Sequence, residues 1–235
     1  MDNTSPNSLD LYAKVEDLLG VKESATKLYA HYFLFLNTSN FTNLLDVGCG
    51  SGDFLTKMQS SLGIPEVKGI DLSPLMVEKS REKALDAECV DLCELEGSYD
   101  VITAVFDMLN YLDTEALKRF LFCVREHLHE GGMFLCDINT LYGFENVAVG
   151  SFIVDDDKRF LTVDSDFEDG EYISEFTLFE KEGASFVKSQ ETIKQYFHTV
   201  EDIAKYSGLE LVVNDDVILY DLEEADKVFL VLRKR

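Results

Sequence analysis

The chain of 235 residues is long enough for one α/β domain carrying an insertion, and its 46% hydrophobic content is ordinary for a globular protein with a sizeable core. Acidic residues outnumber basic residues 45 to 21, and the net charge of −24 argues against a nucleic acid partner, whose phosphates must be neutralised by Lys and Arg. Residues 1–6 carry no basic region followed by an apolar run, and no stretch approaches the ~20 apolar residues that cross a bilayer, so we expect a cytoplasmic protein with no membrane partner.

The cysteines and histidines predict neither a covalent framework nor a metal site. The cysteines are odd in number, contain no C-x-x-C pair and mostly lie within apolar strand or helix patterns: Cys49, Cys89, Cys93, Cys123 and Cys136. No two of the four histidines have metal-ligand spacing. We therefore expect reduced core thiols rather than disulfides, and no bound metal.

Two helices are expected before the first strand. Residues 9–20 and 24–36 each have apolar residues at three- and four-residue spacing, and Ser24 is suited to cap the second helix.

A short apolar strand over 44–47 then leads into three glycines at alternate positions, Gly48, Gly50 and Gly52. Glycine is needed where the backbone takes positive φ or where a ligand comes close to it, and the helix that follows presents free N–H groups to whatever occupies the turn. The turn therefore predicts a small-molecule binding site.

Two acidic residues narrow the choice of ligand. The dinucleotide fingerprint G-x-G-x-x-G would need glycine at position 53, which is Asp53. Asp46 lies at the tip of the strand, and a carboxylate about 5 Å from a pyrophosphate would cost roughly 3 kcal/mol at an effective dielectric near 20. The same carboxylate attracts a cation, so a ligand with an ammonium, a sulfonium and a nucleoside fits better. S-adenosylmethionine has all three.

Strands and helices then alternate as far as residue 136. The expected elements are a helix over 54–61, a strand over 67–71, a helix capped by Ser73 with Pro74 at its first position, strands over 87–90 and 100–106, a helix over 114–129 closed by Gly131, and a strand over 133–136. Such alternation implies a parallel, doubly wound sheet.

The pattern changes between residues 159 and 197, where apolar and polar residues alternate with a period of two. Asp169-Gly170 and Glu182-Gly183 are typical of hairpin turns, so we expect antiparallel β-structure there. The earlier pattern then resumes with a helix capped by Thr199 and terminated by Gly208, followed by strands over 209–213 and 228–232.

The segment Asp46-x-Gly48-x-Gly50-x-Gly52 resembles motif I of the class I S-adenosylmethionine-dependent methyltransferases. Over about the first 140 residues, further segments resemble that family in the expected order: 67–73, Asp91-Leu92, 99–110 and 131–137. The resemblance implies S-adenosylmethionine as cofactor and S-adenosylhomocysteine as product, with Asp71 suited to the ribose hydroxyls and Asp91 to the adenine edge. The cofactor-binding residues that it implies are Asp46, Gly48, Cys49, Gly50, Gly52, Asp71, Leu72, Met76, Asp91, Leu92 and Phe106.

The resemblance also implies a fold. We expect a Rossmann-like, doubly wound α/β domain over 1–147 and 199–235, with a seven-stranded, mostly parallel sheet whose last strand is antiparallel. Residues 1–40 would form a helical cap over the cofactor. Residues 148–198 would form an antiparallel β lid over the substrate, as in enzymes that resemble the glycine and sarcosine N-methyltransferases.

Acceptor contacts are expected after the fourth strand, because ligands of open α/β sheets bind beyond the carboxyl ends of the strands. There Asp107 and Asn110 are suited to bond a substrate amine, and Tyr111 follows them. Tyr12 and Tyr32, with Tyr29, could reach the site from the helical cap, although the pattern favours a role in packing the cap on the sheet. The segment is not the Asn/Asp-Pro-Pro-Tyr/Phe motif of the exocyclic-amine methylases.

Catalytic residues are harder to identify, since methyl transfer is an in-line displacement that depends mainly on positioning. The candidates are Asp107, Asn110, His198 and His31, while His127 and His129 suit the end of a helix. A capped helix entry with a packed ring explains Asn110 and Tyr111 as well as a functional role does.

These patterns predict a methyltransferase that acts on nitrogen or oxygen of a small molecule, as a monomer or a homodimer. Two alternatives stay open: an accessory protein that binds S-adenosylmethionine without catalysis, and an RNA or protein methyltransferase. Hydrolase, zincin and NTPase functions lack support, because G-x-S-x-G, H-E-x-x-H and P-loop motifs are absent.

Overall fold

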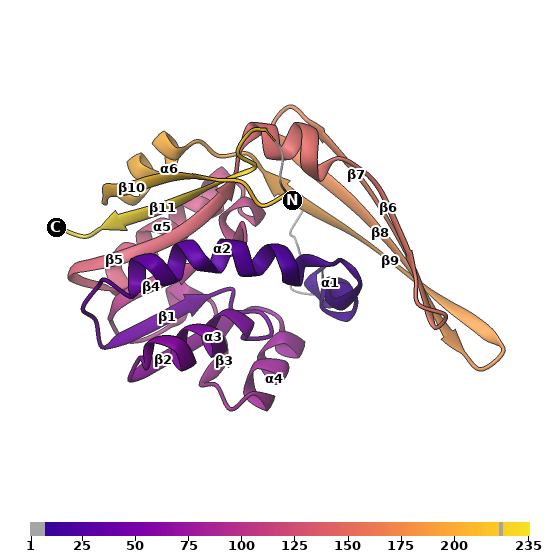
Figure 1. The fold of residues 1–235 in the computed structure, drawn as a ribbon, viewed down its shortest axis with the longest axis horizontal. Helices are drawn as coiled ribbons and strands as arrows, with labels where there is room; N and C mark the ends of the chain where they lie inside the picture. The colour runs from indigo at the N-terminus through magenta and orange to yellow at the C-terminus, as the bar shows by residue number, and fades with distance from the viewer. Residues whose placement is uncertain (1–7, 221–222) are drawn as a thin grey trace.

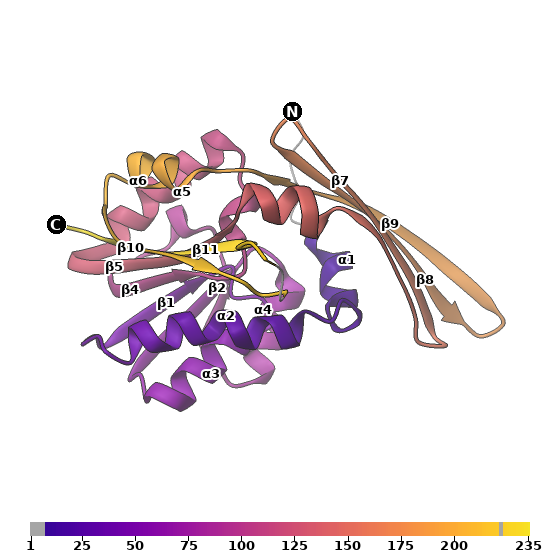
Figure 2. The same ribbon diagram turned by 45° about the horizontal axis from the view of Figure 1, so that its top comes forward.

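Two β-sheets organise the protein, which we describe from a computed structural model of residues 8–220 and 223–235. The larger sheet lies between helices, and a second sheet extends away from it (Figures 1 and 2). Residues 1–6, where we expected no targeting signal, lie outside the described residues.

The larger sheet has seven strands. They are β1 (Asn43–Val47), β2 (Glu66–Asp71), β3 (Ala87–Cys89), β4 (Tyr99–Ala104), β5 (Leu128–Asn139), β10 (Glu210–Val217) and β11 (Lys227–Arg233). Their order in space is β10-β11-β5-β4-β1-β2-β3, and all pairings are parallel except those of β11, which runs antiparallel to β5 and to β10. The expected seven-stranded, doubly wound sheet with a reversed last strand is confirmed.

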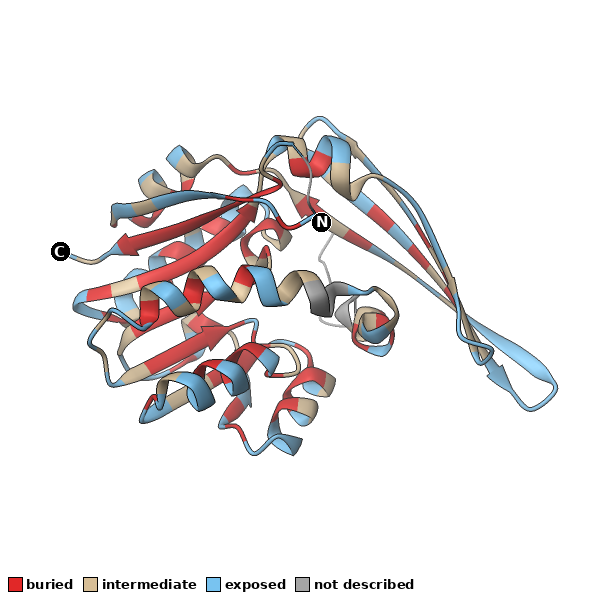
Figure 3. Ribbon diagram, viewed as in Figure 1, coloured by how far each residue is buried: buried red, intermediate tan, exposed pale blue. Residues whose placement is uncertain are grey.

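Helices cover both faces of this sheet. The helices are α1 (Ser8–Val15), α2 (Val21–Leu36), α3 (Asp53–Leu62), α4 (Pro74–Glu82), α5 (Thr114–His127) and α6 (Val200–Ser207), with short helices η1 (Glu16–Leu18), η2 (Leu92–Glu94), η3 (Met108–Tyr111) and η4 (Gly143–Ala148). On one face, α5 and α6 contribute Leu121 and Ile203 to a buried apolar cluster, and on the other α2 and α3 contribute Leu36 and Leu55. Because both faces are covered, the central strands are buried along most of their length (Figure 3).

Three helix ends differ from the prediction. The first expected helix, over 9–20, is α1 up to Val15, followed by the short helix η1. α2 begins at Val21, ahead of Ser24, and Gly20 with φ of 69° precedes it without a side-chain cap. α5 ends at His127, and the residues that follow, expected in the helix, belong to β5. Lys234 accounts for the early end, because its Nζ donates to the carbonyl oxygens of Arg125 and Leu128 at 2.8 Å each. These bonds join segments more than a hundred residues apart, which local patterns do not reveal.

We call the second sheet the roof sheet. It consists of β6 (Gly150–Asp155), β7 (Arg159–Glu168), β8 (Glu171–Glu182) and β9 (Ser185–Tyr196), paired antiparallel in that order. The predicted antiparallel β-structure and both predicted turns are present, and β6 adds a strand before the alternating stretch.

One face of the roof sheet packs on the N-terminal helix α1. Leu161, Phe176 and Leu178 form an apolar cluster there with Leu11 and Val15. Beyond this contact the β8–β9 hairpin projects from the body of the molecule, and its end is exposed (Figures 2 and 3). The docked part of the roof sheet therefore adjoins the larger sheet.

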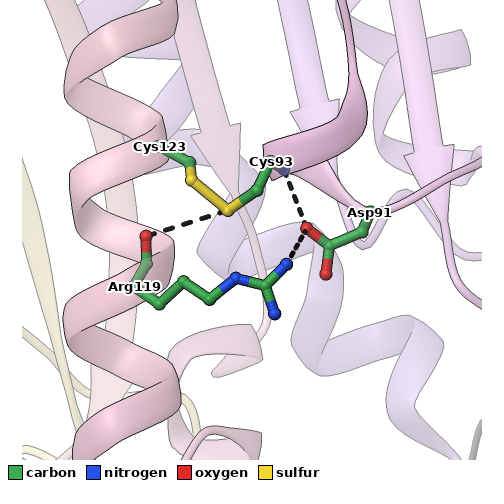
Figure 4. The surroundings of a disulfide bond; sticks show 4 residues. All are labelled: Asp91, Cys93, Arg119 and Cys123. Carbon is green, nitrogen blue, oxygen red and sulfur yellow. Dashed lines mark hydrogen bonds and ion pairs between the residues drawn. A yellow bond between two sulfur atoms is a disulfide. The ribbon is translucent and has the colours of Figure 1, made fainter.

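A disulfide joins Cys93 of η2 to Cys123 of α5 (Figure 4). Our expectation of reduced thiols is wrong for this pair, although Cys49, Cys89 and Cys136 are free. The two cysteines meet only because η2 packs against α5, and their separation of 30 residues gave no indication of this contact. The bond fastens the segment after β3 to a helix that covers the sheet.

We expect the Cys123→Ser variant to lose about 3 kcal/mol of unfolding free energy under non-reducing conditions, because a bridge across a loop of this length restricts the unfolded chain. Denaturant unfolding measures the loss, and wild-type protein in dithiothreitol should match the variant. Replacing the free thiol in Cys89→Ser is the matched control and should change little. Equal stability of Cys123→Ser and oxidised wild type would contradict the bridge.

Candidate active site

Five carboxylates lie along one edge of the larger sheet. The sheet order brings together side chains from the ends of β5, β4, β1, β2 and β3, which are in turn Asp137, Asp107, Asp46, Asp71 and Asp91. Carboxyl ends of parallel strands share one edge, which is where open α/β sheets bind ligands. Because the edge is strongly acidic, it favours a cationic ligand.

The glycine turn between β1 and α3 is shaped by its neighbours. A Cβ atom on Gly48 would lie 2.7 Å from Cγ of Met108, and one on Gly52 would overlap the side chain of Leu85. A Cβ atom on Gly50, in contrast, would meet nothing within 4 Å among the described residues, and its φ of 52° is unusual for other residue types. The turn is therefore closely packed against neighbouring side chains at Gly48 and Gly52, and it is open at Gly50.

Asp71 fastens this turn to the end of β2. Its carboxylate accepts the N–H of Gly50 at 2.9 Å and the N–H of Ser73 at 2.8 Å. Burial raises the pKa of Asp71, and these backbone bonds oppose the rise. A carboxylate has about four lone-pair directions, and the N–H of Leu72 also bonds this group, so one acceptor position stays available for a ribose hydroxyl.

Asp46 is enclosed at the end of β1. It is only 2% exposed, and its Oδ1 accepts the hydroxyl of Thr103 at 2.6 Å. Burial raises the pKa of Asp46 to about 7, with a further contribution from the charge of Asp71, while the Thr103 bond lowers it. The Asp46 carboxyl group therefore titrates in the neutral range.

The other predicted cofactor residues differ in exposure and in role. Leu72 is 49% exposed beside Asp71 and offers an apolar surface. Cys49, Met76 and Leu92 are buried and support the loops from within the core. Asp91 caps η2 by accepting the N–H of Cys93 at 2.8 Å, and Arg119 lies 3.4 Å from the same oxygen (Figure 4).

The turn after β4 has an unusual backbone. Phe106 and Asp107 both have positive φ, at 64° and 52°. The Asp137 carboxylate accepts both of their N–H groups, at 2.7 and 2.8 Å, and also accepts the Tyr32 hydroxyl at 2.7 Å. Two consecutive N–H groups that converge on one anion form an anion-binding nest, and here the anion is the protein's own.

Asp107 is held on both oxygens. Lys227 Nζ lies 2.5 Å from its Oδ1, and Gln195 Nε2 donates to its Oδ2 at 2.6 Å. Lys227 also lies 3.3 Å from Asp137 Oδ2. Burial raises the pKa of Asp107, while the charge of Lys227 lowers it. Two carboxylates and one ammonium leave this buried cluster with one net negative charge when all three are ionised.

Three tyrosines lie close enough to Asp107 for its charge to affect them. Burial raises the pKa of Tyr12, Tyr111 and Tyr220, and the charge of Asp107 raises each further. Tyr12 comes from α1, where it packs edge-on against Phe176 of the roof sheet. Phenol groups from three separate segments therefore lie in the neighbourhood of this carboxylate.

Tyr32 lies on α2 and is fully buried, where it bonds Asp137. Asn110 is also fully buried, donates to the Tyr196 carbonyl at 2.8 Å and accepts the Asn139 N–H at 3.0 Å. These contacts give both residues a clear structural role.

The histidine candidates lie outside the Asp107 cluster. His198 is 5% exposed and bonds the Leu112 carbonyl at 2.8 Å, and burial lowers its pKa. His31 lies against the ring of Phe229.

Three residues of the cluster escaped the sequence analysis: Asp137, Lys227 and Gln195. Asp137 follows the predicted fifth strand directly, and Lys227 precedes the predicted last strand. Because that strand was expected to be reversed, its start lies at the edge where the parallel strands end. The sequence therefore held a signal that could have identified Lys227. Gln195 gave no such signal, since its position depends on how the roof sheet docks.

Comparison with known proteins agrees with this geometry. Residues 44–132 match the family model described as a methyltransferase domain. The putative methyltransferase YqeM of Bacillus subtilis is 26% identical over 184 residues, which cover 72% of this chain and 73% of YqeM.

Two solved structures share the fold over nearly the whole chain. An S-adenosylmethionine-dependent methyltransferase from Clostridium acetobutylicum has a TM-score of 0.76 and 24% identity, covering 96% of this chain and 98% of its own. CalS10, an amino pentose methyltransferase from Micromonospora echinaspora with bound S-adenosylmethionine, has a TM-score of 0.73 and 19% identity, covering 95% of this chain and 97% of its own.

The fold over nearly the whole chain is that of class I S-adenosylmethionine-dependent methyltransferases, and residues 44–132 match a methyltransferase domain. The chain therefore carries a methyltransferase domain at residues 44–132. The open space at Gly50 and the acidic edge of the sheet fit S-adenosylmethionine. No helix among residues 8–220 and 223–235 has the length and apolar character needed to span a membrane.

We expect Asp71→Ala to weaken S-adenosylhomocysteine binding by about 2–4 kcal/mol, because it removes acceptors for the ribose and for the Gly50 N–H. Calorimetry with the 2′-deoxy analogue separates the two effects. Loss of the hydroxyl should weaken binding to wild type and have little effect on the variant. An equal loss in both proteins would refute the ribose contact while leaving the turn contact in place.

We expect S-adenosylhomocysteine to bind wild type about tenfold more tightly at pH 8 than at pH 6, because its ammonium group favours ionised Asp46, whose pKa is about 7. Binding lowers that pKa and releases a proton, so affinity rises with pH. Thr103→Val, which removes the bond that lowers this pKa, should move the transition to higher pH. Asp46→Asn should abolish it, and an unchanged pH profile in that variant would contradict the assignment.

Proposed function

We propose that this methyltransferase transfers a methyl group to an amino group of a small molecule held between the acidic sheet edge and the roof sheet. The observation that carries the proposal is the buried cluster of Asp107, Asp137 and Lys227, whose net charge is negative. A cationic acceptor neutralises this cluster, whereas a neutral or anionic acceptor does not.

The cluster lies next to the residues assigned to the cofactor, where a methyl acceptor must bind. The glycine turn and Asp71 occupy the cofactor half of the edge, and the end of β4 lies beside them in the sheet order. Tyr12, Tyr111 and Tyr220 supply hydroxyl groups around Asp107, which suit an acceptor that carries several polar groups. The similarity to CalS10, an amino pentose methyltransferase, points to an amino sugar as the first compound to test.

When bound, S-adenosylmethionine supplies a methyl group on a sulfonium. The protein holds the acceptor nitrogen in line with that methyl group and excludes water. Asp107 binds the ammonium form of the acceptor and takes its proton, and the freed lone pair forms the new N–C bond as the C–S bond breaks. A hydroxyl group is a far weaker acid than an ammonium group, so a carboxylate suits a nitrogen acceptor better than an oxygen acceptor.

The test is turnover with matched pairs of acceptors. We expect S-adenosylhomocysteine and a product 14 Da heavier to form with an amino sugar, but not with the sugar in which a hydroxyl group replaces the amine. Asp107→Asn should lower kcat/KM by about 10²-fold or more, while S-adenosylhomocysteine affinity stays within twofold. Methylation of the hydroxyl compound would overturn the proposal, and sustained inactivity with all small molecules would favour an accessory role or a macromolecular substrate.

A further inference from the structure

Lys227 is a buried lysine with a complete set of acceptors. It is 3% exposed, and its Nζ lies 2.5 Å from Asp107 Oδ1, 2.7 Å from Asn139 Oδ1 and 3.3 Å from Asp137 Oδ2. An ammonium group has three N–H donors, so each has an acceptor. The ring of Phe106, centred 5.4 Å away, adds a cation–π contact. Lys227 is therefore locked in one position.

This position follows from the reversal of β11. Lys227 is the first residue of that strand and pairs in register with Asn139, the last residue of β5. A parallel strand would place its first residue at the opposite edge of the sheet. The antiparallel strand instead delivers a cation to the edge where the parallel strands end, beside two of their carboxylates.

Without this cation, Asp107 and Asp137 would be two buried carboxylates that face each other across one turn. Two like charges in such a site do not both stay ionised, and one of them takes up a proton. Asp137 would still have three donors, because the N–H groups of Phe106 and Asp107 and the hydroxyl of Tyr32 all donate to it. Asp107, left with the Gln195 amide alone, is the group that becomes neutral.

We propose that Lys227 is a positioning residue for methyl transfer, which keeps the Asp107 carboxylate charged and directed at the acceptor. The proposal rests on the proposed function, in which Asp107 binds the acceptor amine. Lys227 itself touches neither cofactor nor acceptor in this scheme, and it acts through Asp107. The other groups that influence Asp107 are Asp137 of β5, Tyr12 of α1, Tyr111 of η3, Tyr220 of the β10–β11 loop and Gln195 of β9.

The test compares Lys227→Met, which keeps the length of the side chain without its charge, with Lys227→Arg, which keeps the charge. Protein labelled with ¹³C at the aspartate carboxyl carbons is titrated by NMR, and Asp107→Asn assigns the signal. We expect the Asp107 midpoint to rise by about 1–3 pH units in Lys227→Met and to stay near the wild-type value in Lys227→Arg.

Two further measurements separate positioning from general damage to the fold. In Lys227→Met, kcat/KM for the amine should fall about tenfold or more and its acid limb should move to higher pH, whereas S-adenosylhomocysteine affinity should stay within twofold. Lys227→Arg should recover part of the activity. Lys234→Met is the matched control, because Lys234 bonds carbonyl groups near the end of α5 and lies outside the acidic cluster.

An unchanged Asp107 titration in Lys227→Met would overturn the proposal. A loss of S-adenosylhomocysteine affinity in parallel with activity would overturn it too, because it would show a structural role. A shifted Asp107 titration in a protein whose wild type methylates no amine would refute the proposed acceptor, while supporting the hold of Lys227 on Asp107. The failure of each proposal is thus distinguishable.

Discussion

The carboxylate of Asp137 joins the segments that surround Asp107. It is fully buried, and a buried charge is tolerated only where donors surround it. Its donors come from three places: the N–H groups of Phe106 and Asp107 after β4, the Tyr32 hydroxyl on α2, and the ammonium group of Lys227 on β11. One side chain thus fixes the turn after β4, helix α2 and strand β11 relative to one another.

These bonds maintain a turn that would otherwise be unfavourable. A non-glycine residue with positive φ costs on the order of 1–3 kcal/mol, and Phe106 and Asp107 are two such residues in succession. Hydrogen bonds to a charged acceptor are the stronger ones in proteins, and Asp137 supplies one to each residue. The strained backbone aims the Asp107 side chain between Lys227 and Gln195, so the strain is retained where it orients a functional group.

The parts of this arrangement that are local in sequence were predictable. The glycine turn, the acidic strand ends and the Ser73 cap each depend on a few adjacent residues, and the structure contains all three. The Cys93–Cys123 bond and the Gln195–Asp107 contact join segments 30 and 88 residues apart, so only packing reveals them. Lys227 lies between these two cases. Its position at the carboxyl edge follows from the predicted reversal of the last strand, but its contacts with Asp107 and Asp137 depend on packing.

The two halves of the edge differ in how their charges are balanced. In the cofactor half, Asp46 and Asp71 are bonded by the Thr103 hydroxyl and by backbone N–H groups, which are neutral. In the half around Asp107 and Asp137, Lys227 offsets one of two carboxylates. The cofactor half therefore favours a bound cation, and this preference weakens when methyl transfer turns the sulfonium into a neutral thioether. Under the proposed function, the positive charge would pass to the methylated nitrogen beside Asp107, so the acidic edge that attracts the donor would lose part of its hold on the spent cofactor.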